Sequence, residues 1–590
     1  MWRPVRRGGA PLLRAKSWQS QRKQKGNKMT RQTAALRRGI VLAGALAGTL
    51  LLPAPALGAK TAPKPENPTA LPAPAIPGIP ALPGAVAPAA KLGANMSILN
   101  VIPKEGVTGT PVTISGSGLP AKEPVTITWS TAKVNWELDP RVDSVDYLGT
   151  APVEKLSVAL ATATTSSSGS FSVSLKAPDD FGGPHEIAAV VEGVEVGDGA
   201  VFTIDRSATM TPKKGPIGTP ITITYHGLGS SLFEGGASVT YDNHFTGAVT
   251  AYWTRGTAQM KIRASGPVGK HTIQIGDSIT FTYLNIQQSP IPWGAGDTAT
   301  GAGSTFTFTV KKDKGRPKPA MEWPVSVAPT IGSRTTLQAS AVAAGSTATA
   351  TLTPTSGPVQ TSVEVSASGL ANAPVTLTWL TVLGSRVNCP KSTCWNFVSV
   401  PLDNSESLTP SGGSLKAKIT APEGLGGWHA VQLTQGGKVV AQTPFYVKRS
   451  VVGRGVSSLV LKEGQHFTVH LRGLGWTQLD NTIAVDYDNS YIGYGCGFNS
   501  NGDTVMNLVA TGGPGTHLID MYPQLYNSQP AYANTPYGVV PMLTFARDMP
   551  GLALGYDLPA IRLAITVVKQ PRHNGAKHKA HPPKRSALRH

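Results

Sequence analysis

The chain has 590 residues, which is enough for about three to five domains of the usual size. Glycine (65 residues) and proline (49 residues) are frequent, but they stay below the ~25–30% that marks low-complexity disorder. Only 15% of the residues are charged, against about 25% in a typical protein. This composition excludes a coiled coil and a charged disordered polymer, and it is typical of a turn-rich β protein outside the cell.

The formal net charge of +20 is concentrated at the two ends of the chain. Residues 1–59 carry 12 Lys/Arg and residues 569–590 carry 7, and neither segment has an acidic residue. The 509 residues between them therefore hold only about +1 of the total. A nucleic-acid-binding domain carries its basic face on the folded part of the chain. We therefore expect no specific nucleic-acid partner.

The first 59 residues are predicted to be a leader and signal peptide (1–59). Arg37–Arg38 precede the apolar stretch 39–52, and small residues follow up to Ala59, which is the order of a secretory signal. The apolar stretch is shorter than the ~20 residues of a membrane-spanning helix. We expect a secreted, extracellular protein, either released by cleavage or held at the envelope by an uncleaved signal-anchor. The export route, general secretory or twin-arginine, stays open, as does a true start at Met29.

Residues 60–95 are rich in proline and alanine. Such a composition favours extended polyproline geometry, so this segment is predicted to be a semi-rigid linker. A second linker, rich in Pro, Ala, Ser and Thr, is predicted at 312–345.

The region between the leader and the tail is a duplication. Motifs of its first half recur in the same order 244 to 250 residues later: Pro124–Trp129 as Pro374–Trp379, Gly182–His185 as Gly426–His429, Val239–Asn243 as Val485–Asn489, and Gly269–His271 as Gly515–His517. The conserved order and spacing indicate two copies of a two-domain unit. The four predicted domains span 96–205, 206–311, 346–448 and 449–568.

The repeated segments alternate apolar and polar residues with the period of a β-strand. Val125, Ile127 and Trp129 alternate with threonines, which places the apolar side chains on one face of a half-buried sheet. Clusters of Ser, Gly and Asn separate the short runs. This pattern predicts an all-β fold of tandem Ig-like β-sandwiches, with disordered basic termini.

The start of each predicted domain resembles a known family. In the first, Pro103, Gly106 and Gly109 are followed by alternating aliphatic residues and by Gly118–Leu119, which resembles the opening of IPT/TIG-type immunoglobulin-like domains. The same opening begins at Pro212 and Pro354, and a degraded form contains Gly464 and Gly473–Leu474. The resemblance implies an Ig-like sandwich used for association, and it carries over no catalytic residue.

Signatures of catalysis are missing from the sequence. There is no Gly-x-Ser-x-Gly elbow, no His-Glu-x-x-His helix and no phosphate-binding glycine loop. We therefore predict a protein that is not an enzyme and has no cofactor or metal. Four histidines recur after glycine-containing turns: His185, His271, His429 and His517. We interpret them as strand-entry residues bonded to backbone, with ligand contact as the alternative.

A Tyr-Asp-Asn element occurs once in each copy and is the candidate ligand surface. Asp and Asn also favour tight turns, so a hairpin with a core tyrosine is the alternative. Two further tyrosines of the second copy would add stacking platforms for a glycan or partner. The candidate residues are Tyr241, Asp242, Asn243, Tyr487, Asp488, Asn489, Tyr491 and Tyr494.

Cys389 and Cys394 bracket a four-residue loop and are predicted to form a disulfide. Two thiols or a metal site are the alternatives, although a structural zinc site usually wants four ligands. The third cysteine, Cys496, lies outside this pair.

The C-terminal segment 569–590 is predicted to be a basic disordered tail, because it has almost no apolar residue to bury. It either makes electrostatic contact with an anionic surface or is merely solvated. The whole chain is predicted to be a non-catalytic secreted or cell-surface protein of a bacterium, acting in adhesion, display or ligand binding. Its partner would be a cell-envelope polymer, a glycan or a surface protein. Two rivals are a carbohydrate-active enzyme with its site in the last domain, which needs two carboxylates in one groove, and a purely structural envelope spacer.

Overall fold

A computed structural model of the chain describes the following residues: 85–86, 90–91, 98–134, 136–140, 145–150, 154–196, 199–230, 234–276, 304–323, 342–385, 394–402, 408–453, 459–477, 480–498, 500–524, 540–543, 548, 555–556 and 558–569. All regular structure in this part of the chain is β-strand. Consequently it offers no helix that is long and apolar enough to cross a membrane. The predicted leader, most of the first linker and most of the tail lie outside the described residues.

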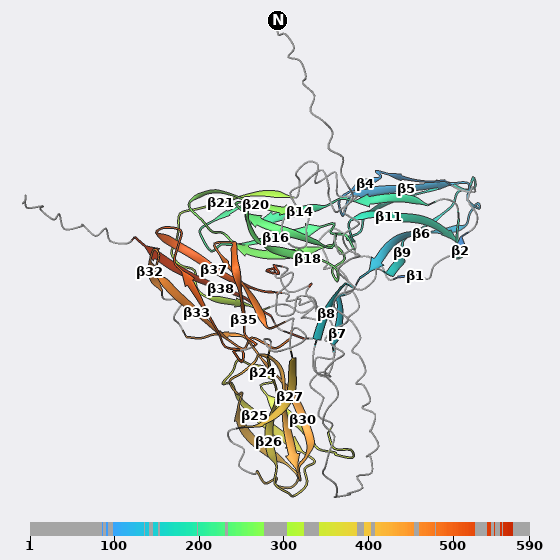
Figure 1. Cartoon of the computed structure of the whole chain (residues 1–590). Helices are drawn as coiled ribbons and strands as arrows, with labels where there is room; N and C mark the ends of the chain where they lie inside the picture. The colour runs from blue at the N-terminus through green and yellow to red at the C-terminus, as the bar shows by residue number, and fades with distance from the viewer. Residues whose placement is uncertain are drawn as a thin grey trace, which may run out of the picture. The chain divides into compact units, whose positions relative to one another are not determined.

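The strands form four sandwiches, each with a three-stranded sheet opposite a larger sheet (Figure 1). In sandwich 1 the small sheet has the order β10-β5-β3. The large sheet contains the order β9-β6-β11-β13, with β4 paired to β13 at its edge. The strands of sandwich 1 are β1 (Ala85–Val86), β2 (Ala90–Lys91), β3 (Ile98–Ile102), β4 (Glu105–Gly106), β5 (Pro111–Ser117), β6 (Pro124–Lys133), β9 (Glu154–Thr164), β10 (Phe171–Lys176), β11 (Gly183–Val191), β12 (Val194–Glu195) and β13 (Ala200–Ile204). Between β6 and β9, the strands β7 (Trp136–Pro140) and β8 (Val145–Thr150) pair with each other in a separate two-stranded sheet.

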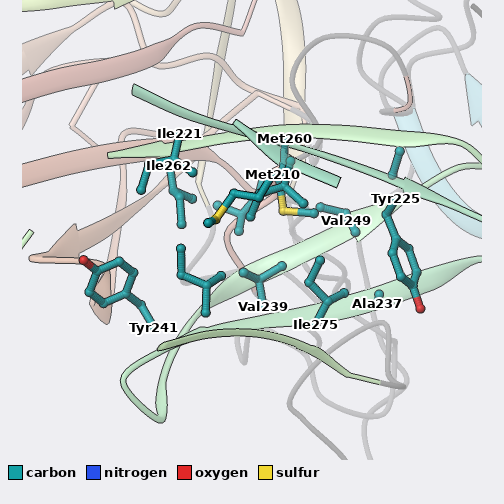
Figure 2. Close-up of a cluster of buried hydrophobic side chains, with 14 of the residues drawn as sticks. Met210, Ile221, Tyr225, Ala237, Val239, Tyr241, Val249, Met260, Ile262 and Ile275 are labelled. Carbon is teal, nitrogen blue, oxygen red and sulfur yellow. The ribbon is translucent and has the colours of Figure 1, made fainter. Parts of the chain in front are cut away.

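Sandwich 2 has the sheets β14-β16-β19 and β15-β21-β20-β17-β18. The buried side chains between them include Ile221, Val239 and Met260 (Figure 2). Its strands are β14 (Ser207–Thr211), β15 (Lys214–Gly215), β16 (Pro220–His226), β17 (Gly236–Tyr241), β18 (His244–Thr250), β19 (Ala258–Arg263), β20 (Gly269–Gly276) and β21 (Thr305–Val310).

Sandwich 3 repeats this topology with the sheets β23-β25-β28 and β24-β30-β29-β26-β27. Its strands are β23 (Thr349–Thr353), β24 (Ser356–Gly357), β25 (Ser362–Ser368), β26 (Thr376–Ser385), β27 (Cys394–Pro401), β28 (Leu415–Thr420), β29 (Gly427–Gln435) and β30 (Lys438–Val447). Cys394 begins β27, but Cys389 lies outside the described residues, so their disulfide stays a prediction.

Sandwich 4 has the sheets β31-β33-β36 and β22-β38-β37-β34-β35, with β32 also paired to β38. Its strands are β22 (Ala320–Glu322), β31 (Ser450–Val451), β32 (Val460–Lys462), β33 (His466–Arg472), β34 (Thr482–Tyr487), β35 (Ser490–Cys496), β36 (Thr504–Val509), β37 (Gly515–Pro523) and β38 (Ala560–Val568). The chain is thus all-β, with tandem Ig-like β-sandwiches.

The alternation of apolar and polar residues predicted from the sequence determines which side chains form the core of each sandwich. In β5 the side chains of Val112 and Ile114 are buried, whereas Pro111 and Thr113 are exposed. The same alternation occurs in β16 and β25. Each sandwich therefore closes on aliphatic side chains of its inward faces.

Both predicted linkers contribute strands, which their composition did not predict. From residues 60–95, β1 pairs with β9 and β2 pairs with β12. From residues 312–345, β22 pairs antiparallel with β38 and so extends the large sheet of sandwich 4. A proline-rich chain is already extended, so a short stretch without proline can add to a sheet edge.

The junctions within the two copies are built alike. The Gly182 amide of sandwich 1 donates to the Leu228 carbonyl of sandwich 2 at 2.9 Å, and the Gly426 amide of sandwich 3 donates to the Leu474 carbonyl of sandwich 4 at 2.9 Å. Residue 426 must be small, because a Cβ there would lie 1.8 Å from the Gly473 carbonyl oxygen.

Every sandwich contains a histidine stacked on an aromatic ring, a contact that the sequence did not predict. The ring centroids are 4.4 Å apart for Trp129–His185, 5.5 Å for Tyr241–His271, 5.0 Å for Trp379–His429 and 5.6 Å for Tyr487–His517. In all four, Nε2 lies 2.7 to 2.9 Å from the carbonyl oxygen four residues earlier. The histidines therefore fix the turn that precedes their strand.

The second ring nitrogen distinguishes sandwiches 3 and 4. His429 Nδ1 faces the Leu380 carbonyl, and burial lowers the pKa of His429 to about 4. His517 Nδ1 lies 2.5 Å from the Asp488 carboxylate. Burial also lowers the pKa of His517, but the hydrogen bond and the charge of Asp488 outweigh it, so this pKa is raised overall.

The two histidines are therefore expected to give opposite pH dependences. The stabilisation by His517 is present below about pH 6.5 and is lost as the pH rises through its raised pKa, whereas that by neutral His429 is lost as the pH falls toward 4. In Asp488→Asn we expect the His517 pKa, followed by NMR, to fall. The free energy of unfolding should drop by about 1 kcal/mol at pH 5.5 and by less at pH 8.5.

The control for this prediction is Glu364→Gln, which removes an exposed carboxylate from sandwich 3. It should change neither the His517 titration nor the pH profile. A His517 titration that is the same in Asp488→Asn and in the unmodified chain would contradict the assignment of the raised pKa to Asp488.

Candidate functional site

The two Tyr-Asp-Asn elements form equivalent hairpin turns. Asp242 and Asn243 join β17 to β18, and Asp488 and Asn489 join β34 to β35. All four residues have positive φ, between 48° and 65°, which is the geometry of a type I′ hairpin. A β-bulge precedes each turn at the same place, after Val239 and after Val485.

The tyrosines of the two elements lie in the sandwich cores. The Tyr241 hydroxyl donates to the Ser265 carbonyl at 2.9 Å, and the Tyr487 hydroxyl donates to the Thr511 carbonyl at 2.8 Å. Their exposed fractions are 3% and 8%. These two rings therefore offer no face to a ligand, because both pack on a histidine inside the sandwich.

The carboxylates of the turns are occupied by contacts within their own sandwiches. Asp242 accepts hydrogen bonds from the Thr272 amide at 2.8 Å and from His271 Nδ1 at 2.6 Å. Asp488 makes the same pair of contacts with the Leu518 amide and with His517. The histidine thus connects the hairpin to the neighbouring strand of the sheet.

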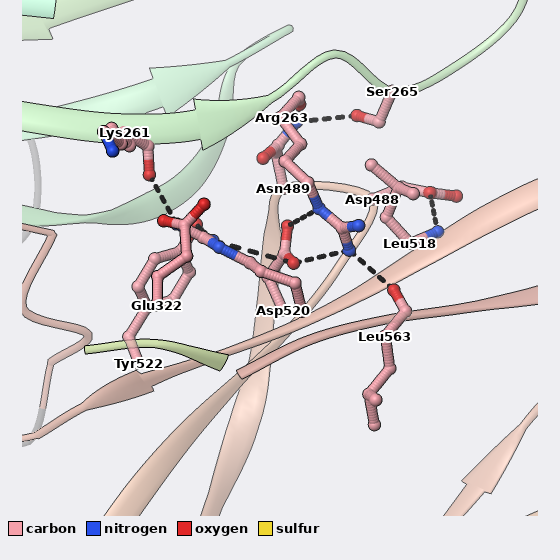
Figure 3. Close-up of polar contacts among 11 residues, drawn as sticks. Lys261, Arg263, Ser265, Glu322, Asp488, Asn489, Leu518, Asp520, Tyr522 and Leu563 are labelled. Carbon is pink, nitrogen blue, oxygen red and sulfur yellow. Dashed lines mark hydrogen bonds and ion pairs between the residues drawn. The ribbon is translucent and has the colours of Figure 1, made fainter. Parts of the chain in front are cut away.

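The two asparagines differ in their surroundings. Asn243 is exposed, whereas Asn489 is 1% exposed because it contacts sandwich 2. The Asn489 side-chain amide donates to the Arg263 carbonyl and to Ser265 Oγ, both at 2.7 Å (Figure 3). The backbone carbonyl of Asn489 accepts a hydrogen bond from the Thr246 hydroxyl at 2.6 Å. This turn therefore connects two sandwiches.

The last two predicted residues, Tyr491 and Tyr494, also differ in their surroundings. The Tyr491 hydroxyl accepts a hydrogen bond from the Gln524 side chain at 3.0 Å, and its ring packs edge-on against Phe245 of sandwich 2 at 6.3 Å. Tyr494 is 42% exposed. Of the eight candidate residues, two therefore lie in cores, three in turns, two in an inter-sandwich contact, and Tyr494 on the surface of β35. Asn243 and Tyr494 are the exposed residues among them.

A buried charge cluster lies beside Asn489, and sequence inspection missed it. Arg263 of β19 contacts both carboxylate oxygens of Asp520 of β37 (Figure 3). A terminal guanidinium nitrogen lies 2.6 Å from one oxygen, and Nε donates to the other at 3.2 Å. Both side chains are nearly inaccessible, at 6% and 1% exposure. The Arg263 guanidinium also donates to the Leu563 carbonyl at 2.6 Å. The pair joins residues that are 257 positions apart.

A second guanidinium completes the cluster. Arg562 of β38 lies 3.6 Å from Asp520 and donates to the Tyr522 hydroxyl at 2.7 Å. It also donates to the Lys261 carbonyl of sandwich 2 at 2.9 Å and lies 3.4 Å from Glu322 of the linker strand β22. Two guanidinium groups thus face two carboxylates, which is what a buried cluster needs to be tolerated.

Apolar contacts and added strand pairing continue the same interface. The core of sandwich 2 extends to Tyr522, Leu543 and Ala560 of the last sandwich. At the edge of β18, the Ala248 amide donates to the Pro541 carbonyl at 2.9 Å, and the Leu543 amide donates back to Ala248 at 2.8 Å. Sandwiches 2 and 4 therefore share buried apolar, polar and backbone contacts.

One carboxyl group in this interface lacks compensation. Asp486 is 0% exposed and lies opposite Asp520 in the sheet. Neither of its oxygens accepts a hydrogen bond within the described residues. Burial raises the pKa of Asp486 well above its ordinary value, and the charge of Asp520 adds to this, while Arg562 opposes it. Because the other charges balance, a protonated Asp486 leaves the cluster neutral.

The interface is not reciprocal between the copies. Asp486 and Asp520 correspond to Thr240 and Gln274 of sandwich 2, and Arg263 corresponds to Val509 of sandwich 4. The duplicated framework is therefore the same, while the charged residues occur once. The two carboxyl groups lie under another sandwich and not in a groove, so they do not support the enzyme alternative. Within the described residues, no group of three or more His, Cys, Asp or Glu side chains could hold a metal.

Comparisons with known proteins give no family. No family model and no curated protein matches the chain. Among solved structures, the adhesin FdeC of Escherichia coli is 11% identical, with 61% of this chain and 99% of that one covered, at a TM-score of 0.14. The adhesin InvE of Yersinia pseudotuberculosis is 11% identical, with 38% and 65% covered, at 0.15.

Alpha-2-macroglobulin of E. coli is 8% identical to the chain, with 82% of this chain but only 30% of that one covered, at a TM-score of 0.17. At such scores the likenesses carry no argument about function. The IPT/TIG resemblance likewise remains a prediction from the sequence.

Replacing the uncompensated carboxyl should stabilise the protein in a pH-dependent way. A raised pKa in the folded state means that stability is lost as the pH rises above the ordinary Asp value of about 4. We expect Asp486→Asn to raise the free energy of unfolding by about 1–3 kcal/mol at pH 7.5 and to have little effect at pH 4. Denaturant unfolding at both pH values measures this.

The matched control for Asp486→Asn is Glu463→Gln, an exposed carboxylate of the same sandwich. It should leave stability within about 0.5 kcal/mol at either pH. A loss of stability in Asp486→Asn at pH 7.5 would show that the ionised carboxylate is compensated after all.

Proposed function

We propose that this is a non-catalytic secreted or cell-surface protein that acts in adhesion, display or ligand binding. The observation that carries the proposal is the tandem array of Ig-like sandwiches with repeated junctions and a tightly packed contact between sandwiches 2 and 4. Such an array holds surface residues at fixed positions, which suits presentation to a partner. The predicted signal peptide supports localisation outside the cytoplasm.

The partner in this proposal is a cell-envelope polymer, a glycan or a surface protein. The exposed Tyr494 and Asn243 are the remaining candidates for contact from the Tyr-Asp-Asn elements. An exposed tyrosine ring offers apolar area together with a hydroxyl group, which suits sugar rings and protein surfaces alike. The two candidate residues lie on different sandwiches, so each would belong to its own contact.

The full chain should bind immobilised glycans or isolated bacterial cell walls without releasing products. We expect Tyr494→Ala to weaken that binding by about tenfold, since stacking on an aromatic ring contributes about 1 kcal/mol or more. The matched control is Val505→Ala, which truncates another exposed side chain of sandwich 4, on β36. A glycan array and a chromogenic glycoside assay on the same preparation provide the two readouts.

Three outcomes separate the classes. Binding that depends on Tyr494 supports the proposal. Release of sugars favours the carbohydrate-active enzyme. Failure to bind glycans, cell walls and surface proteins leaves the structural spacer.

A further inference from the structure

Six lysines gather at one end of sandwich 2. In sequence they span about a hundred residues, but the sheet brings them to the end of β21: Lys213, Lys214, Lys270, Lys311, Lys312 and Lys314. All six are exposed. We call this set the lysine patch. It is part of the folded body, whose overall charge is nearly zero, so the net charge of the chain did not reveal it.

The strand register places three of these lysines on one face. Lys214 of β15 and Lys270 of β20 are both paired with Thr309 of β21, from its two sides. Residues paired in a sheet point to the same face. Lys311 lies two residues beyond Thr309, so it belongs to that face too, and its own amide donates to the Gly215 carbonyl at 2.8 Å. Because neighbouring strands are about 4.8 Å apart, the three Cα atoms lie within roughly 10 Å.

The remaining three lysines flank this centre. The Lys213 carbonyl accepts a hydrogen bond from the Thr309 amide at 3.0 Å. Lys312 and Lys314 continue along the chain that leaves β21. The patch is therefore a row that starts on the sheet and extends along the beginning of the linker.

Within the described residues, Asp313 is the acid among the six lysines, so the patch keeps a net positive charge. None of the six ammonium groups forms an ion pair there. Asp313, the acid inside the cluster, accepts hydrogen bonds from the Gly315 amide at 2.7 Å and from the Thr516 amide at 3.3 Å, so it is engaged with backbone. Lysines gathered on one face repel one another through the solvent, so folding alone does not favour this arrangement.

Sandwich 4 shows that the framework does not require lysines. Its β32, β37 and β38 repeat the same pairing around Thr566, and the residues at the positions of Lys214, Lys270 and Lys311 are Val460, Thr516 and Val568. Val460 and Val568 are themselves exposed. The same backbone therefore accepts uncharged residues at these positions. The lysines of sandwich 2 are thus not needed for folding, so their role lies in contact with solvent or with a ligand.

We propose that the lysine patch binds a linear anionic polymer, with closely spaced phosphate or carboxylate groups along its chain. Lysine presents a compact charge on a flexible stem. A cluster of lysines therefore suits a ligand with a high density of negative charge, and it does not require one fixed arrangement of the anionic groups. An elongated row of such charges fits a linear polymer. This inference does not depend on the Tyr494 surface.

A lipid surface fits the patch less well. Membrane-binding segments combine basic residues with large apolar or aromatic side chains that enter the bilayer. Residues 311–318 contain Lys, Arg, Asp, Gly and Pro and no such side chain. Val268, near Lys270, is exposed, but one valine supplies little area for insertion.

The test uses the full chain and three triple variants. Lys214→Gln with Lys270→Gln and Lys311→Gln removes the centre of the patch. Lys214→Val with Lys270→Thr and Lys311→Val installs the residues that sandwich 4 already carries, so folding should be retained. The matched control is Lys104→Gln with Lys416→Gln and Lys438→Gln, which removes the same charge from exposed sites of sandwiches 1 and 3. All variants keep the basic tail.

Binding is measured with long-chain polyphosphate and with polyglutamate, each from low to high salt, and with phosphatidylglycerol vesicles. We expect both patch variants to bind at least one polymer about tenfold more weakly at ~0.1 M salt. The slope of log K against log salt should become shallower by about 2, since each lost contact to a flexible polyanion contributes about 0.7. The control should change affinity less than about twofold. The polymer arms distinguish phosphate from carboxylate.

Two results would overturn the proposal. Equal losses in the patch variants and in the control would mean that only net charge or the tail matters. Lysine-dependent binding to vesicles, without binding to either polymer, would assign the patch to a membrane surface. Neither result bears on the Tyr494 experiment, so the two proposals fail separately.

Discussion

The contact between sandwiches 2 and 4 depends on burying Arg263, Arg562 and Asp520 together. Taking charges out of water costs several kcal/mol per ion, and this is offset only when each charge finds a partner in good geometry. Here Asp520 faces both guanidinium groups, and each guanidinium also donates to a backbone carbonyl, Arg263 to Leu563 and Arg562 to Lys261. Removing one partner in the docked arrangement would leave the other charge buried and unpaired, so the cluster specifies which surfaces of the two sandwiches meet.

Duplication followed by divergence explains why one framework carries different chemistry. The hairpin turns keep the same dihedral angles and the same Asp–His contact in both copies, but Asn243 is exposed and Asn489 is buried against sandwich 2. The end of β21 carries lysines where the end of β38 carries valines. The backbone pairing sets where a side chain points, and the individual residue then determines whether that position serves packing, docking or contact with solvent.

The local pattern of the sequence predicted the fold well, because alternation and turn residues act over a few positions. Val112 and Ile114 are buried as alternation requires, and the four histidines bond to backbone carbonyls at strand entries. The candidate site was predicted poorly. Tyr241 and Asn489 have similar sequence surroundings to exposed turn residues, and only tertiary contacts show that one fills a core and the other an interface. The Arg263–Asp520 pair and the lysine patch join segments far apart in the chain, so no local pattern signals them.

A double-mutant cycle between Arg263 and Asp520 tests the central claim most directly. The free energy of unfolding is measured for the unmodified chain, for Arg263→Met, for Asp520→Asn and for the two changes together. A buried pair that joins the two sandwiches should give a coupling energy of at least about 1.5 kcal/mol. Effects that add within about 0.3 kcal/mol would show that the two side chains do not meet, and the docked arrangement of sandwiches 2 and 4 would then be wrong.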